Sequence, residues 1–192
     1  MRARLIPVGI AFALLLVCVT VVASCGQQHA TPAPSPKLRS HDWAAVACGS
    51  DHTVVLRKDG TLWAWGGNDA GQLGLGDTKE RHTPIRVGGA SDWTTVACGY
   101  DFALAVKKDG SLWAWGHNYV GQLGLGDTTT RLTPSRVGTA NDWASVSCGD
   151  GDTLAAKTNG TLWAWGFNGN GELGLGDTKE RHTPTEVGSG SP

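Results

Sequence analysis

Few residues in this 192-residue chain combine the types and the spacing that chemistry requires, and the cysteines are the first to consider. Cys48, Cys98 and Cys148 lie 50 residues apart at equivalent places in the sequence. Three equivalent thiols cannot all pair as disulfides within one chain, and no Cys-x-x-Cys pair provides the usual ligand spacing of a zinc site. We therefore expect these cysteines to be small buried core residues, and we predict no metal site.

A glycine-rich segment, Gly71-Gln72-Leu73-Gly74-Leu75-Gly76, has the composition of a phosphate-binding loop but a different spacing. Its order is G-x-x-G-x-G, and no Lys-Ser or Lys-Thr pair ends it, as phosphate binding would require. The segment also recurs twice further along the chain. We therefore expect its glycines to permit tight turns and its leucines to anchor the loop in the core.

Acidic and imidazole side chains do not form a recognisable catalytic or calcium-binding pattern. Asp51 and Asp101 occupy equivalent positions, but Gly151 replaces them in the third unit. Calcium needs several converging oxygen ligands, which this pattern does not supply. His82 and His182 recur where the second unit has a leucine. No Ser-His-Asp or paired-carboxylate arrangement is evident either. We predict that the protein is not an enzyme and that it binds no cofactor.

The elements that position these residues belong to a 50-residue unit that repeats three times, at residues 42–91, 92–141 and 142–192. Such self-similarity indicates that each unit is one supersecondary element that cannot bury its own faces. Every unit opens with Asp-Trp and carries an Asp-Gly or Asn-Gly pair between two apolar runs. These pairs favour the type I′ turn of an antiparallel hairpin.

Alternation within the units predicts short strands. In Leu62-Trp63-Ala64-Trp65, both tryptophans point to one face of a strand and the smaller residues to the other. A short strand that contains Val46 and Cys48 precedes the hairpin, and residues 84–87 are expected to form a fourth strand, with Pro84 at its start or on an exposed edge. Four short strands per unit predict a propeller blade. The fold class is therefore all-β: a partial β-propeller of three four-stranded blades.

Composition and charge agree with this class and exclude others. The chain has 28 glycines without a three-residue period, which excludes collagen, and its 40% hydrophobic content excludes general disorder. The formal net charge is −1, and the basic residues are spread along the repeats rather than concentrated in a stripe. We therefore expect no nucleic-acid partner.

The N-terminal segment has the features of an export signal. Arg2 and Arg4 precede an apolar run over residues 5–24. The sequence Val22-Ala23-Ser24-Cys25 resembles a bacterial lipobox, which implies a lipoprotein signal peptide over residues 1–24 and lipid attachment at Cys25. Residues 25–41 then form the lipidated Cys and a Pro-rich tether. The alternative is an uncleaved membrane anchor. Both interpretations place the repeats in the bacterial cell envelope, extracytoplasmic and held to a membrane.

A set of residues in the first unit carries a family resemblance. It comprises Val46-Ala47-Cys48-Gly49, Asp59-Gly60, Leu62-Trp63-Ala64-Trp65-Gly66, Asn68 and the glycine-rich segment at 71–76. The units resemble the regulator of chromosome condensation repeat, in its bacterial form. The resemblance implies a β-propeller, usually seven-bladed, that serves as a protein-binding platform. The eukaryotic namesake promotes nucleotide exchange on a small GTPase and binds chromatin, whereas other members inhibit enzymes or sense light. Three repeats and the predicted export argue against nucleotide exchange and chromatin binding here.

Aromatic residues suggest where function resides. All nine tryptophans fall at three positions of the repeat, so we expect them to pack blade against blade. Other aromatic residues lie where the three units differ most, and we expect them to project from the blade rims as candidate partner-binding residues. They are Tyr100, Phe102, His117, Tyr119 and Phe167.

These features together predict a membrane-anchored, non-catalytic protein-interaction module. One alternative is a structural assembly protein that oligomerises through open blade edges, and a second is carbohydrate or cell-wall binding. An unrecognised hydrolase is a third. Three blades do not close a ring, so the repeats could form a homodimer that completes a propeller, belong to a longer propeller, or persist as an open array.

Overall fold

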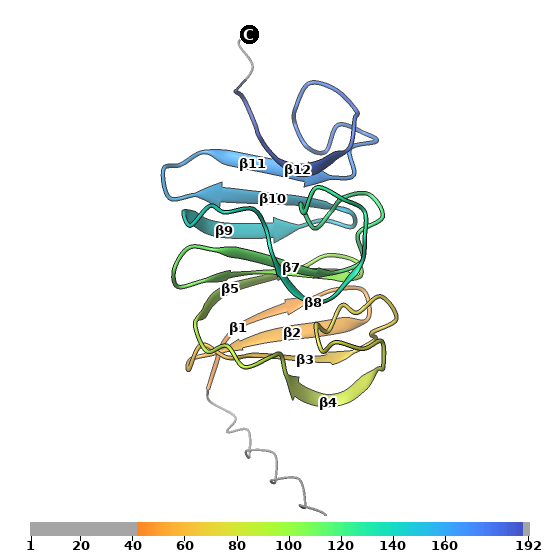
Figure 1. Ribbon diagram of the computed structural model, residues 1–192, viewed down its shortest axis with the longest axis vertical. Helices are drawn as coiled ribbons and strands as arrows, with labels where there is room; N and C mark the ends of the chain where they lie inside the picture. The colour runs from red at the N-terminus through yellow and green to blue at the C-terminus, as the bar shows by residue number, and fades with distance from the viewer. Residues whose placement is uncertain (1–41, 190–192) are drawn as a thin grey trace, which may run out of the picture. The chain divides into compact units, whose positions relative to one another are not determined.

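A computed structural model describes residues 42–189 of the chain (Figure 1). The predicted signal peptide, Cys25 and the proline-rich tether lie outside the described residues, as do residues 190–192. The described residues contain strands β1 to β12 and no helix. Accordingly, residues 42–189 include no helix with the length and apolar character needed to cross a membrane.

The strands form three antiparallel sheets, each with its four strands side by side in chain order. Blade 1 consists of β1 (Trp43–Cys48), β2 (His52–Arg57), β3 (Leu62–Gly66) and β4 (Arg81–Arg86). Blade 2 consists of β5 (Trp93–Cys98), β6 (Phe102–Lys107), β7 (Leu112–Gly116) and β8 (Arg131–Arg136). Blade 3 consists of β9 (Trp143–Cys148), β10 (Asp152–Lys157), β11 (Leu162–Gly166) and β12 (Arg181–Glu186). The prediction of an all-β partial propeller with three four-stranded blades is confirmed.

The Asp-Gly pair of the sequence lies at the turn of the hairpin within the blade. Gly60 has a φ of 78°, a left-handed conformation that glycine adopts without strain, and its amide donates to Arg57 O at 2.9 Å. The Asp59 carboxylate accepts hydrogen bonds from the amide and the hydroxyl of Thr61. Equivalent contacts recur at Asp109 with Ser111, so the predicted hairpin forms in successive blades. The predicted type I′ turn was wrong: Arg57 accepts from Gly60 and donates to Thr61, so Lys58 and Asp59 are the central residues and Gly60 is the left-handed residue that follows them in a three-residue loop.

The outermost strand begins earlier than the sequence pattern indicated. We expected residues 84–87, but β4 spans Arg81–Arg86 because Arg81 already pairs with Gly66 of β3. The register shifts between Ala64 and Gly66, so the outer strand is irregular where it begins. Pro84 is tolerated there because β4 is the edge strand of its sheet.

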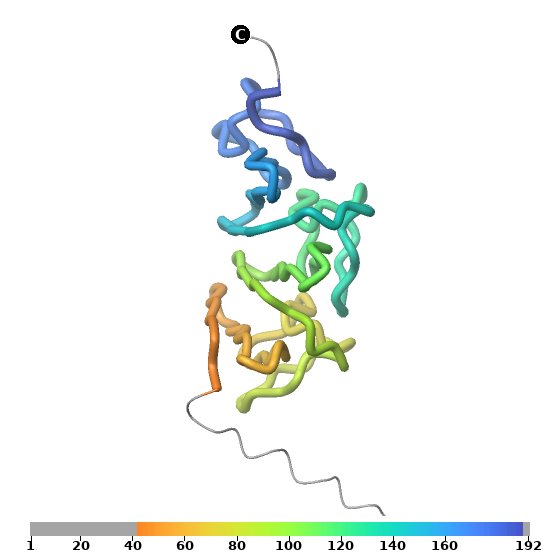
Figure 2. The backbone as a smooth tube through the Cα atoms, turned by 90° about the vertical axis from the view of Figure 1, so that its left-hand side faces the viewer, coloured from red at the N-terminus to blue at the C-terminus, as the bar shows by residue number. Residues whose placement is uncertain are grey.

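The blades stack face to face in chain order, with the innermost strands β1, β5 and β9 next to one another (Figures 1 and 2). Trp93 and Trp115 of blade 2 pack against an apolar cluster of blade 1 that includes Val54, Leu56 and Leu62. The indole of Trp115 is fully buried and donates to the Gln72 carbonyl oxygen of blade 1 at 2.9 Å.

The same arrangement recurs at the next junction, where Trp143 and Trp165 of blade 3 pack on blade 2. Trp165 donates to the Gln122 carbonyl oxygen at 3.0 Å. Tryptophan pairs meet edge to face within each of these layers, with ring centroids 6.2 Å apart for Trp93 and Trp113. The predicted blade-to-blade role is therefore confirmed for the tryptophans of blades 2 and 3.

The glycine-rich segment is a structural loop in each blade. The Asn68 side chain is fully buried; its amide nitrogen donates to the carbonyl oxygens of Asp77 and Lys79, and its oxygen accepts from the Leu73 amide. A Cβ at Gly74 would lie only 2.9 Å from Trp115 Nε1, so this glycine lets the loop pass over the neighbouring indole. Asn118 and Asn168 repeat the same contacts.

The three repeat cysteines differ in their surroundings: our expectation of buried core residues was wrong for Cys48 and holds only in part for Cys98 and Cys148. Cys48 is exposed because no earlier blade covers β1 among the described residues, whereas Cys98 and Cys148 are partly covered and pack against the inter-blade clusters. Burial raises the pKa of the Cys98 thiol to about 12 and also raises the pKa of Cys148. All three thiols are free.

Candidate functional site

A hollow of about 370 Å³ opens on the rim where blades 2 and 3 meet, and we call it the rim hollow. The loops that follow β5, β7, β9 and β11 surround it, together with Gln122. Its lining residues are Tyr100, Asp101, His117, Val120, Gln122, Asp150, Gly151 and Phe167. The hollow therefore contains three of the five predicted partner-binding residues.

Tyr100 is held at the rim by its backbone. Its amide donates to Asp150 O of blade 3 at 3.4 Å, and its carbonyl oxygen accepts from the Ser50 amide of blade 1 at 3.1 Å. The Tyr100 side chain nevertheless remains 58% exposed. Three consecutive blades thus fix one backbone segment while its phenol ring is free to contact a partner.

His117 and Tyr119 extend the aromatic surface beyond the rim hollow. Their ring centroids are 4.2 Å apart, and Tyr119 is 70% exposed. The Gln122 side-chain amide donates to His117 Nδ1 at 3.0 Å, while its oxygen accepts from the Val120 amide. The hydrogen bond from Gln122 and the contact with the Tyr119 ring orient the imidazole, so it supports Tyr119 with little loss of freedom on binding.

Phe102 does not belong to this surface, and our expectation that it projects from the rim was wrong. Phe102 is fully buried in the cluster between blades 2 and 3, next to Leu104 and Trp165. It is the first residue of β6, so its side chain points to the same face as Leu104 and Val106. That alternation was present in the sequence and could have placed Phe102 in the core.

Negative charge borders the rim hollow. Asp101 and Asp150 line it, and neither lysine nor arginine does. Burial raises the pKa of nearby Asp152, and the Glu172 and Asp150 carboxylates raise it further. The arrangement of aromatic rings beside carboxylates suits a cationic side chain, which both groups attract. The sequence prediction missed three lining residues: Asp101, Gln122 and Asp150. A polar residue in a loop gives no binding signal by itself, whether it is the same in all repeats or differs between them.

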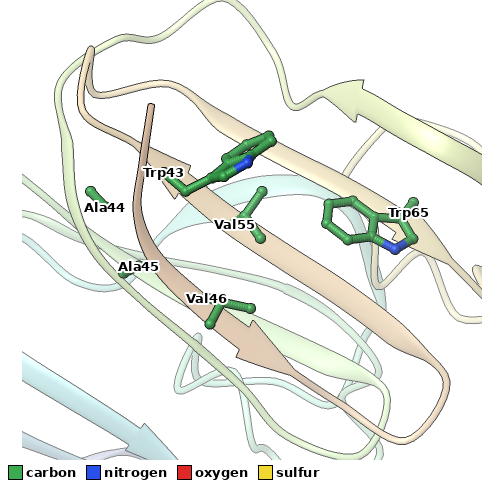
Figure 3. A pocket seen from close by; sticks show the side chains of 6 residues that line it. All are labelled: Trp43, Ala44, Ala45, Val46, Val55 and Trp65. Atoms are coloured by element: carbon green, nitrogen blue, oxygen red, sulfur yellow. The ribbon is translucent and has the colours of Figure 1, made fainter. Parts of the chain in front are cut away.

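A second surface is the face of blade 1 that no described residue covers. Trp43, Ala44, Ala45, Val46, Val55 and Trp65 line a hollow of about 430 Å³ there. Figure 3 shows Trp43 and Trp65 on either side of Val55. These residues correspond in the repeat to those with which blade 2 contacts blade 1, and Val46 is 66% exposed. Within residues 42–189, no preceding blade packs on Trp43 and Trp65, so their predicted blade-to-blade packing is not observed.

A third hollow, of about 340 Å³, lies along the innermost strand ends and is lined by the three Cys-Gly pairs of the repeats, with the residue that follows each pair. The raised pKa values of Cys98 and Cys148 make these thiols poor nucleophiles and metal ligands. Of the three thiols that line this hollow, Cys48 alone is exposed.

Two family models match the chain, and both describe the regulator of chromosome condensation (RCC1) repeat. One matches residues 59–106, 109–156 and 159–191, and the other matches residues 43–72, 93–122 and 143–172. The human X-linked retinitis pigmentosa GTPase regulator is 58% identical over 38 residues, which cover 20% of this chain and 4% of that protein. The ultraviolet-B receptor UVR8 of Arabidopsis thaliana is 37% identical over 57 residues, covering 30% of this chain and 13% of the receptor.

Solved structures show the same architecture. Prp20p from Saccharomyces cerevisiae, described as binding Gsp1p and histones, has a TM-score of 0.70 at 24% identity, covering 76% of this chain and 38% of Prp20p. The yeast RCC1 protein (Prp20) in complex with Kap60 gives a TM-score of 0.68 at 24% identity, covering 76% of this chain and 37% of that one. The chain thus spans less than half the length of these relatives, and at this identity the likeness concerns the fold alone.

Proposed function

Because the chain belongs to the regulator of chromosome condensation (RCC1) repeat family, we propose that its three blades form a non-catalytic module that binds a partner protein. The single observation that carries the proposal is the rim hollow, where aromatic side chains stand exposed on a backbone fixed by contacts between blades. Exposed aromatic residues on a rigid support are typical of protein contacts.

The lining of the rim hollow indicates what the partner presents. The two carboxylates have no lysine or arginine beside them in the lining, and the rings of Tyr100 and Phe167 offer π faces. A lysine or arginine of the partner would interact with both kinds of group. We infer that the partner inserts a basic side chain there, while Tyr119 contacts the surface around it.

The proposed location is the extracytoplasmic side of a bacterial membrane, with Cys25 lipidated and residues 1–24 removed. This proposal rests on the basic, apolar and lipobox segments of the sequence. Mass spectrometry of the N-terminal peptide tests it: a diacylglyceryl group on Cys25 supports the proposal, and an unmodified peptide that begins at Met1 contradicts it.

Exchange of residues between repeats provides fold-compatible tests of the binding surface. Blade 1 carries Ser50 where blade 2 has Tyr100, and Asp69 where blade 2 has Tyr119. The double variant Tyr100→Ser/Tyr119→Asp should therefore fold and should lose capture of the partner in affinity purification from cells. The matched control is Leu132→His, which introduces the blade 1 residue at an exposed position outside the rim hollow.

The result depends on comparing these two variants. Loss of a specific protein with the double variant, and its retention with the control, supports the proposal. Equal capture by both variants contradicts it. Loss of cell-wall glycan rather than protein would instead favour the carbohydrate-binding alternative.

A specific observation also favours assembly between copies of the chain. In blades 2 and 3, the residues equivalent to Trp43, Val46 and Trp65 are covered by the preceding blade. The complementary apolar face is partly open in blade 3, where Leu162 is 40% exposed although its blade 1 equivalent, Leu62, is fully buried. We propose as a second candidate that blade 3 of one copy packs on blade 1 of another.

Light scattering tests this second candidate. The substitution Val46→Lys places a charge at the centre of the uncovered face of blade 1 and should convert a larger species to a monomer. The matched control is Val96→Lys, since Val96 packs within the junction of blades 1 and 2 and should destabilise the fold without selectively changing assembly. A wild-type protein that is monomeric over a wide concentration range would contradict the candidate.

A further inference from the structure

A histidine and two aspartates converge on the rim at the junction of blades 1 and 2. One nitrogen of His52 and one carboxylate oxygen each of Asp51 and Asp101 all lie within 4.8 Å of one another. We propose that these three residues form a binding site for a divalent transition metal of the zinc type. The site is separate from the proposed partner surface except for Asp101, which borders both.

His52 provides the observation that points to a ligand. Its side chain is only 2% exposed, yet neither ring nitrogen has a hydrogen-bond partner among the described residues. A buried polar group without a partner costs about 1–3 kcal/mol, so such groups are rare and need a cause. The ring nitrogens of histidine are common metal ligands, and one of them lies within 4.8 Å of both carboxylates.

The backbone fixes the position of the imidazole. His52 is the first residue of β2, and the Gly49 amide donates to its carbonyl oxygen at 2.9 Å. A Cβ at Gly49 would lie 2.0 Å from His52 Cε1, so the ring rests directly on this glycine. The backbone therefore bounds the ring on this side, and one of its nitrogens lies within 4.8 Å of both carboxylates.

The two carboxylates are oriented but not neutralised. The Ser50 hydroxyl lies 3.3 Å from Asp51 Oδ1 and 3.2 Å from Asp101 Oδ1, and the Gln72 amide donates to the same Asp101 oxygen at 3.3 Å. Within residues 42–189, neither aspartate forms an ion pair with a basic side chain. Two carboxylates beside an unpartnered imidazole suit a divalent cation.

The size of the cluster fits zinc after a small contraction. Zinc binds nitrogen and carboxylate oxygen at about 2.0–2.2 Å, which places tetrahedral ligands about 3.3–3.5 Å apart. The present limit of 4.8 Å requires the ligand atoms to approach by at most about 1.5 Å. Asp51 is exposed, so its side chain can make this movement. Three protein ligands leave a position for water or for a donor from a partner.

The repeats supply an internal comparison, because the same junction between blades 2 and 3 lacks the set. There Phe102 takes the place of His52, and Gly151 takes the place of Asp101. Gly67 also differs: a Cβ there would lie 2.3 Å from Asp51 Oδ2, and blade 2 has His117 at that position. Only one of the two described junctions therefore combines the ligands with the space they need.

Zinc titration of the full chain tests the proposal. The protein is purified in detergent, which keeps either the apolar segment 5–24 or the proposed lipid on Cys25 in solution. It is then treated with a chelator and titrated with Zn²⁺ by calorimetry and with Co²⁺ by visible absorption. We expect one Zn²⁺ per chain and a tetrahedral Co²⁺ spectrum. The variant His52→Phe should lower the affinity at least about 100-fold, because even outer-shell partners contribute about 10- to 100-fold.

Three further measurements separate ligand loss from misfolding. Phe102 is fully buried at the equivalent position, so His52→Phe should preserve the circular dichroism spectrum while losing the zinc-dependent rise in Tm. Asp101→Asn should lose the same metal response. His82→Leu, which removes an exposed histidine, should retain it.

The outcomes are decisive in either direction. Zinc binding that is lost in both ligand variants and kept in the control supports the site. The proposal is overturned by wild-type protein that binds no Zn²⁺, by binding that survives in His52→Phe, or by saturation with Ca²⁺ without a tetrahedral Co²⁺ spectrum.

Discussion

Replacement of the second tryptophan of each LWAWG segment by phenylalanine tests how the blades hold together. The same change is made at Trp65, Trp115 and Trp165, which occupy equivalent positions in β3, β7 and β11. Trp115 and Trp165 are fully buried and donate to a carbonyl of the preceding blade, whereas Trp65 faces no described blade. The substitution is therefore the same at all three positions, and only the blade that covers the tryptophan differs.

The magnitude follows from these contacts. Phenylalanine lacks three heavy atoms of the indole, which costs about 1–2 kcal/mol in a buried site. The carbonyl oxygen of Gln72 or Gln122 also loses its donor, which costs about a further 1–2 kcal/mol. We expect Trp115→Phe and Trp165→Phe to lower the free energy of unfolding by about 2–4 kcal/mol. Trp65→Phe should cost less than about 1 kcal/mol in the monomer, since its ring is only partly covered.

Urea denaturation followed by circular dichroism measures the three values from the shift in midpoint at constant m-value. If a second copy covers blade 1, the cost at Trp65 should increase with protein concentration. Equal costs at all three positions in a protein shown to be monomeric would refute the reasoning, because an uncovered tryptophan would then contribute as much as a buried one.

Three other predictions use single residues of the blades. Asn118→Ala removes the hydrogen bonds of a fully buried amide and should destabilise the protein by about 2–4 kcal/mol in the same urea assay, whereas an effect below about 0.5 kcal/mol would contradict the loop's structural role. Asp152→Asn should raise Tm at pH 7 but not at pH 3. The pKa of Asp152 is raised in the folded state, so its ionised carboxylate destabilises the fold only at a pH above its unfolded pKa. A higher Tm of the variant at pH 3 would refute this. Iodoacetamide at pH 8 should alkylate exposed Cys48 much faster than Cys98, whose pKa is about 12, and peptide mass spectrometry showing equal rates would exclude that difference.

Local patterns in the sequence predicted the blade architecture well. The alternation in Leu62-Trp63-Ala64-Trp65 and the Asp59-Gly60 turn depend on neighbours within one hairpin, so they could be interpreted without the rest of the chain. The start of β4 was missed because its pairing depends on an irregular register with β3 rather than on apolar alternation. Exposure of Cys48 was missed for another reason: burial of an innermost strand depends on which blade stands beside it.

Contacts between blades were the least predictable part. The hydrogen bond from Trp115 is accepted by the backbone carbonyl oxygen of Gln72, so the type of side chain at position 72 does not predict it. Asp51, His52 and Asp101 come from two units, and comparison of the repeats shows only that such positions differ, not that they meet. Phe102 shows the converse: it varies between units because it fills an inter-blade gap, not because it contacts a partner.

Site-specific photo-crosslinking in living cells tests the proposed binding surface most directly. A photoreactive phenylalanine derivative replaces Tyr119, which is 70% exposed beside the rim hollow, and in a separate variant it replaces Asp69, the equivalent exposed residue of blade 1. The proposal predicts a discrete crosslinked protein from position 119 and not from position 69. The same yield at both positions, or no crosslink at position 119, would contradict it.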